Sequence, residues 1–72
     1  MEKHRYGVEF NVVKNGNTMK YAAFFGLPQI FWGEGHDEAE CRGEAIRKAE
    51  LYAQELSSPD CTFSIASCDL WQ

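Results

Sequence analysis

The sequence predicts an α+β fold in a single domain, residues 1–72, with three strands, a helix and a fourth strand in that order. Three observations carry this prediction. Residues 5–13 alternate apolar and polar side chains, residues 37–56 place apolar side chains at helical spacing, and residues 61–68 alternate again. We therefore expect one mainly antiparallel four-stranded sheet, in the order 3-2-1-4, with one helix on one face.

The first two strands are expected to form a hairpin. The alternating segment 5–13 ends at Asn15-Gly16, and this dipeptide is typical of a two-residue type I′ turn because both positions tolerate positive φ. Such a turn sets the register of the second strand, residues 17–25. The expected pairs are Lys14 with Asn17, Val12 with Met19, Phe10 with Tyr21, Val8 with Ala23, and Tyr6 with Phe25.

A short third strand, residues 29–33, should fold back on the second. Pro28 ends the second strand because proline cannot donate to the ladder. Either Ile30 and Trp32 or Phe31 face the core, since the loop length is open. In both cases one large aromatic side chain lies on the outer face near Phe24. Residues 33–35 are expected to form only a turn before the helix.

The helix begins at Asp37, which with Glu40 forms an arrangement close to a capping box. Small residues at the centre of its apolar stripe allow close packing against a sheet. The stripe comprises Cys41, Ala45, Ala49, Tyr52, Ala53 and Leu56, with Ile46 beside it.

The last strand returns beside the first, and we expect the two to be parallel. Its alternation divides the side chains between two faces. Cys61, Phe63 and Ile65 are expected on one face, and Thr62, Ser64, Ala66 and Cys68 on the other.

Charge is distributed unevenly along the chain, whose net charge is −4. Residues 1–33 carry four basic and two acidic side chains, whereas residues 34–72 carry three basic and nine acidic ones. Because an acidic helix repels phosphate, we expect no direct binding of nucleic acid. The acidic half suits a basic protein partner such as the positive groove of a nuclease, although a solvated helix face would carry the same charge.

The cysteines and the N-terminus indicate a cytoplasmic protein. Cys61 and Cys68 would lie more than roughly 20 Å apart on one strand, beyond disulfide reach. Three reduced thiols are typical of a reducing compartment. Residues 1–7 lack the apolar stretch of a secretory signal, and the longest apolar run, residues 21–27, is too short to span a bilayer.

Two segments carry a family resemblance. Tyr21–Pro28 (YAAFFGLP) is an aromatic-rich strand entering a Leu-Pro turn, and Trp32–Ala39 (WGEGHDEA) leads into the amphipathic helix. Both resemble the HicB-like antitoxin domain, a truncated ribonuclease H fold, although Gln29 replaces its usual glycine and His36 its threonine. The resemblance implies a domain that covers the active site of a small RNA-cleaving toxin. Since no second domain follows residue 72, we expect neither operator binding nor autorepression.

Residue types suited to catalysis are scattered. A ribonuclease H-like site needs three or four carboxylates around two divalent ions. The candidates by position are Glu9, Glu38 or Glu40, and Asp69. Glu9 is expected on the face away from the helix, so a metal-dependent nuclease is the weakest alternative. His36, Asp37 and Cys41 lack a second ligand pair at zinc-site spacing, so they predict a capping turn. We expect no catalytic residue, no metal and no cofactor.

Together these features predict a non-enzymatic module that inhibits a basic nucleic-acid-acting enzyme by binding it stoichiometrically. The acidic residues expected to face that partner are Glu40, Glu44, Glu50 and Glu55. Phe24, Phe31 and Trp32 are expected to anchor either the partner or a second copy of the chain. In size and charge the chain also resembles phage counter-defence (anti-CRISPR-like) inhibitors. A structural, homo-oligomerising accessory protein is a further alternative.

Overall fold

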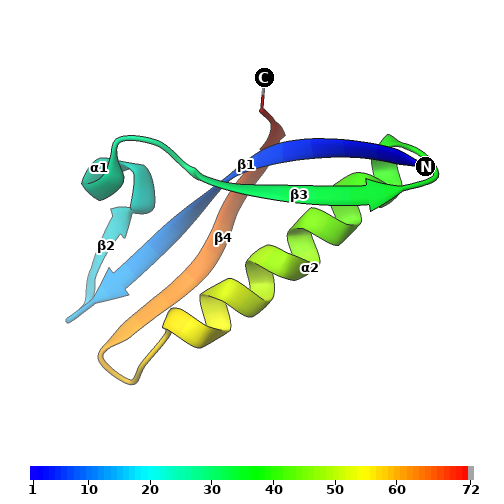
Figure 1. The fold of residues 1–72 in the computed structure, drawn as a ribbon. Helices are drawn as coiled ribbons and strands as arrows, with labels where there is room; N and C mark the ends of the chain where they lie inside the picture. Colours follow the sequence, from blue (N-terminus) through cyan, green and yellow to red (C-terminus); the bar gives the residue numbers. More distant parts are fainter. Residues whose placement is uncertain (72) are drawn as a thin grey trace.

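One long central strand organises the sheet (Figure 1). The computed structural model describes residues 1–71, with all of their side chains except that of Phe24. β1 (Glu2–Lys14) pairs with β3 (Gln29–Gly35) through its first half and with β2 (Asn17–Lys20) through its second half. β4 (Cys61–Leu70) pairs with β1 from residue 6 to residue 14, so it occupies the opposite edge.

The predicted fold class is confirmed. All strand pairs are antiparallel, and the main helix α2 (Glu38–Leu56) packs against one face of the four-stranded sheet. β2 and β3 lie on one side of β1 and β4 lies on the other, as in the predicted order 3-2-1-4. One detail differs from the prediction, because β3 pairs with β1 and not with β2.

The hairpin between β1 and β2 follows the predicted turn chemistry. Asn15 and Gly16 have φ angles of 53° and 79°, the left-handed region that a type I′ turn requires. The register pairs Lys14 with Asn17 and continues towards Lys20 as expected. The predicted pairing therefore holds for the four residues of β2.

Beyond Lys20, the predicted second strand is wrong, because Tyr21–Phe25 forms the short helix α1. The Ala22 N–H donates to Glu9 Oε1 at 3.0 Å, which satisfies an amide that the first helical turn leaves free. β3 takes the place of this predicted strand beside the first half of β1. Val8 faces Gln29, and Tyr6 faces Phe31.

β4 was predicted to run parallel to β1, and that prediction is wrong because α1 replaces the second half of the predicted second strand. A strand at 17–25 would have reversed into the third strand, and β4 would then have run parallel to β1. Instead α1 lets the chain continue in the direction of β2, so β3 runs antiparallel to β1. α2 returns along the sheet, and β4 starts opposite Lys14 and is antiparallel to β1 (Figure 1).

Two glycines of β3 let α2 lie directly on the strand. A Cβ at Gly33 would come within 1.8 Å of the Cys41 carbonyl oxygen, and one at Gly35 within 2.4 Å of the Glu40 Cβ. The segment 33–35 is therefore part of the strand, and the turn predicted there is wrong. Asp37 caps the helix as predicted, since its Oδ1 accepts the Glu40 N–H at 2.9 Å.

The core lies between α2 and the inner face of the sheet. Its buried residues are Tyr6, Val8, Phe10, Val12, Tyr21, Cys41, Ala45, Ala49, Ala53 and Cys68. Cys68 was predicted on the face opposite Phe63 and Ile65, and that prediction is wrong because of a β-bulge. Glu9 pairs with Ser67 and Phe10 with Ile65, so Ala66 is an extra residue that reverses the alternation.

No helix within residues 1–71 is long and apolar enough to cross a membrane.

Candidate protein-binding surface

The side of α2 that faces away from the sheet carries two of the four predicted acidic residues. Small buried side chains from Cys41 to Ala53 hold the opposite side of the helix against the sheet. Glu50 and Glu55 are exposed on the remaining surface. Glu40 is exposed as well, but it lies beside β3, where its Oε1 accepts the His36 N–H at 2.7 Å.

Glu44 differs from the other acids because it binds β3. Its Oε1 accepts the Glu34 N–H at 2.7 Å and lies 3.5 Å from the Lys48 Nζ. Lys48 Nζ also donates to the Trp32 carbonyl at 2.7 Å. The backbone N–H of Glu34 and the nearby Lys48 charge lower the pKa of Glu44, while partial burial opposes them. Glu44 therefore holds helix and strand together in addition to contributing negative charge.

Leu51 lies on the outer side of α2, as its place outside the apolar stripe predicts, but it is not among the predicted partner-binding residues. Its side chain is 61% exposed. It borders a shallow depression of about 310 Å³ with Arg47, Glu50 and Gln54. We call this surface, formed by Arg47, Glu50, Leu51, Gln54 and Glu55, the acidic helix face.

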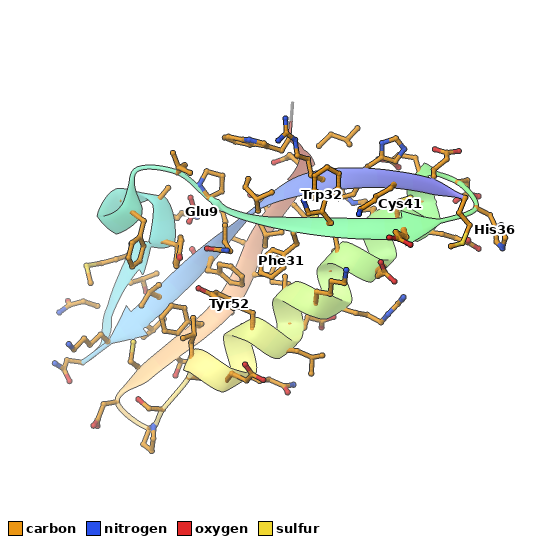
Figure 2. The ribbon with its side chains drawn as sticks, in the orientation of Figure 1. Glu9, Phe31, Trp32, His36, Cys41 and Tyr52 are labelled. Atoms are coloured by element: carbon orange, nitrogen blue, oxygen red, sulfur yellow. The ribbon has the colours of Figure 1, made fainter. Side chains whose placement is uncertain are left out.

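The three predicted aromatic anchors do not lie together. Phe31 points towards the core, with ring centroids 6.4 Å from Phe10 and 5.5 Å from Tyr52 (Figure 2). Trp32 follows on the outer face and is 46% exposed. The side chain of Phe24 lies outside the described residues. The structure therefore resolves the open choice between Phe31 and Trp32: Phe31 belongs to the core.

Trp32 forms part of a mixed aromatic and basic surface on the outer face of the sheet. Lys3 Nζ lies 5.1 Å and Arg5 Cζ 5.9 Å from the Trp32 ring centroid, within cation–π range. Trp71 covers Gly7, where a Cβ would come within 2.8 Å of the indole. Glu34 lies 3.8 Å from the Lys3 ammonium, so the positive charge is partly neutralised.

The carboxylates considered for a nuclease do not converge on a metal site within residues 1–71. Glu9 Oε1 accepts the N–H groups of Phe10 and Ala22, and Figure 2 shows Glu9 well separated from Cys41 of α2. Asp69 lies on β4 opposite Gly7. Within residues 1–71, no three His, Cys, Asp or Glu side chains are placed to hold a metal ion.

The buried thiols are chemically protected. Cys41 and Cys68 are both buried, and burial raises the pKa of each thiol. A neutral thiol is a poor nucleophile, because the thiolate is the reactive form. These cysteines therefore serve the core.

Comparison of the chain with protein-family models, with curated proteins and with solved structures finds no match. The fold and surface described above define a small α+β module in which one helix covers one sheet face. Its helix and its outer sheet face both present exposed side chains. These two surfaces are the basis of the function proposed below.

Proposed function

We propose that this protein is a non-enzymatic inhibitor that binds a basic nucleic-acid-acting enzyme stoichiometrically. In this proposal it resembles a HicB-like antitoxin domain that covers the active site of an RNA-cleaving toxin. The observation that carries the proposal is the acidic helix face, in which the exposed Leu51 shares a depression with Glu50 and lies one helical turn before the exposed Glu55.

The charge of this face suits the surface of such an enzyme. Proteins that act on nucleic acids attract phosphates with clustered lysine and arginine side chains. The exposed carboxylates of Glu50 and Glu55 carry the same negative charge as those phosphates, so they suit the same basic surface. Charged rim residues mainly accelerate association, whereas an apolar residue buried at the centre slows dissociation. Leu51 supplies the apolar centre and the glutamates supply the rim.

The first test is capture from a lysate of the source cells, with the wild-type chain immobilised at low salt. The proposal expects a basic nucleic-acid-processing enzyme to be retained. Glu55→Lys and Leu51→Ala should retain it roughly tenfold less. Glu2→Lys is the matched control, because it makes the same charge change at an exposed residue of β1, outside the acidic helix face. Equal retention by Glu55→Lys and wild type would contradict the role of the acidic helix face.

The identity of the captured enzyme separates two forms of this proposal. A small toxin that cleaves RNA supports the antitoxin form, whereas a nuclease of a defence system supports a phage counter-defence inhibitor. A captured protein without activity on nucleic acid contradicts both.

Self-association through the outer sheet face is a second candidate. It is favoured by the exposure of Trp32 and by the neighbouring Trp71, which is 37% exposed. Sedimentation equilibrium should then reveal a concentration-dependent dimer that Trp32→Asp dissociates. A monomer at millimolar concentration contradicts this candidate.

A further inference from the structure

The edge of β4 that faces away from β1 is open. Within residues 1–71, β4 pairs with β1 alone. The Cys61 N–H bonds to the Ser58 carbonyl at 3.2 Å, and the Phe63 N–H bonds to Ser57 Oγ at 2.9 Å. Both groups therefore point away from β1. Because alternate residues of an antiparallel strand face the same edge, Ile65 also directs its N–H and C=O outwards.

After the bulge, alternate residues of β4 again face β1 and the open edge. The Trp71 N–H donates to the Arg5 carbonyl at 2.9 Å, so residue 71 faces β1. Asp69, two residues earlier, faces β1 as well, and Cys68 and Leu70 face the open edge. The backbone groups available for pairing thus extend from Ile65 to Leu70. Ser57 and Ser58 already occupy the beginning of the edge.

A groove of about 550 Å³ borders this edge between β4 and α2. It is lined by Glu50, Ala53, Gln54, Ser57, Phe63, Ser64 and Ile65. Phe63 and Ile65 are only half-buried and supply an apolar floor. An open strand beside a helix, with an apolar depression between them, is the geometry that accepts an extended peptide as an added strand.

Charge favours a basic occupant. Glu50 is exposed on the helix side of the groove, and Asp60 and Asp69 lie at the two ends of β4. Residues 60–70 include no lysine or arginine. Among the residues that line the groove, Glu50 carries a charge, so the groove itself is negative.

We infer that the open edge from Ile65 to Leu70 binds an extended basic segment of the partner protein as an additional antiparallel strand. An apolar side chain of that segment enters the groove over Phe63 and Ile65, and its lysine or arginine side chains lie near Glu50. This inference rests on the proposed function, since it states how the basic partner binds. A second copy suits the groove less well, because a two-fold pairing of β4 would bring both Glu50 carboxylates to the same groove.

The test is an NMR titration of the ¹⁵N-labelled chain with a seven-residue synthetic peptide of alternating lysine and valine. The largest amide shift changes are expected at Ile65, Cys68 and Leu70, together with slower hydrogen exchange at these amides. Changes at Leu51 alone, or no changes at millimolar peptide, would overturn the inference.

Two control peptides separate backbone pairing from charge. A peptide with glutamate in place of lysine should bind at least tenfold more weakly, because it meets the acidic groove. A peptide N-methylated at alternate residues should lose at least tenfold in affinity, because it cannot complete the ladder. Unchanged affinity of the N-methylated peptide would overturn strand addition.

A pair of protein variants localises the site. Glu50→Lys should weaken peptide binding about tenfold, whereas Glu2→Lys, which makes the same charge change on β1 outside the groove lining, should leave it unchanged. Equal effects of the two variants would overturn the inference. The same amide shifts on raising the protein concentration without peptide would also overturn it, because they would show that a second copy of the chain binds the edge.

The captured enzyme distinguishes failure of this inference from failure of the proposed function. If the enzyme is bound and inhibited without shifting the amides of Ile65–Leu70, strand addition is wrong and the proposed function stands. If the peptide binds the edge but Glu55→Lys retains the enzyme as wild type does, the role of the acidic helix face is wrong instead.

Discussion

At the scale of single residues, Gly33 determines how closely α2 approaches the sheet. A Cβ at this position would lie 1.8 Å from the Cys41 carbonyl oxygen and 2.8 Å from its carbonyl carbon. These are backbone atoms, so no rotamer change can relieve the overlap. Gly33→Ala should therefore cost roughly 3 kcal/mol or more, or prevent folding, because the helix must move away from β3.

Gly43 provides the matched control for Gly33. Its nearest contact for an added Cβ is Arg47 Nη1 at 3.8 Å, so the site is open. Since Gly43 lies inside α2, Gly43→Ala should gain about 1 kcal/mol through helix propensity. Urea denaturation of both variants measures these changes, and equal stabilities would contradict the close packing of α2 on β3.

Thiol reactivity should separate the three cysteines. Cys61 is partly exposed at the start of β4, whereas Cys41 and Cys68 are buried. Titration of the folded protein with Ellman's reagent should modify Cys61 rapidly and the other two only after unfolding. Rapid modification of all three thiols without denaturant would show that the core is not closed.

Alkaline pH should destabilise the fold through two tyrosines. Burial raises the pKa of Tyr6 to about 12, and the hydrogen bond to the Tyr52 hydroxyl, with burial, raises the pKa of Tyr21 to about 12. The unfolded value is 10.0 for both, so their contribution is full below pH 10 and is lost as the pH rises towards 12. Urea midpoints at pH 9 and pH 11 measure the loss, and Tyr21→Phe should reduce it.

At the scale of elements, α1 depends on one side chain from another element. Glu9 Oε1 accepts the N–H groups of Phe10 and Ala22, both at 3.0 Å. Glu9→Ala leaves the start of α1 uncapped and should cost about 1 kcal/mol, with faster hydrogen exchange at Ala22. Glu9→Gln keeps an oxygen acceptor and should retain most of the protection. If both variants exchange like wild type, Glu9 does not hold α1.

Elements specified by local chemistry were predictable from the sequence. Asn15-Gly16 determined the turn and the register of β2, and Asp37 with the alanine stripe determined α2. α1 was not predictable in this way, because Tyr21–Phe25 is a wholly apolar run that fits the hairpin register of a strand, and its capping carboxylate comes from β1. The bulge at Ala66 depends equally on a neighbouring strand, and it moved Cys68 into the core.

The candidate surface was predictable to a similar extent. Helical periodicity placed Glu50 and Glu55 outside. It could not show that Glu44 binds the Glu34 N–H, because that contact depends on how α2 lies across β3. The choice between Phe31 and Trp32 depended on strand register, which the unpredicted α1 changed.

At the scale of the whole molecule, one helix covers one side of the sheet and leaves two surfaces for partners. The acidic helix face opposes the outer sheet face, where Lys3 and Arg5 surround Trp32. A net charge of −4 on 72 residues favours approach of a basic partner. Because charges on the helix rim are exposed, the association should weaken as salt is raised.

Stoichiometric inhibition is tested by titrating the activity of the captured enzyme with this protein. At enzyme concentrations well above the dissociation constant, activity should fall linearly and reach its minimum at one molar equivalent. Glu55→Lys should shift the curve to higher concentration at low salt, while Glu2→Lys should follow wild type. Full activity at a large molar excess of the wild-type chain would show that the protein is not an inhibitor of that enzyme.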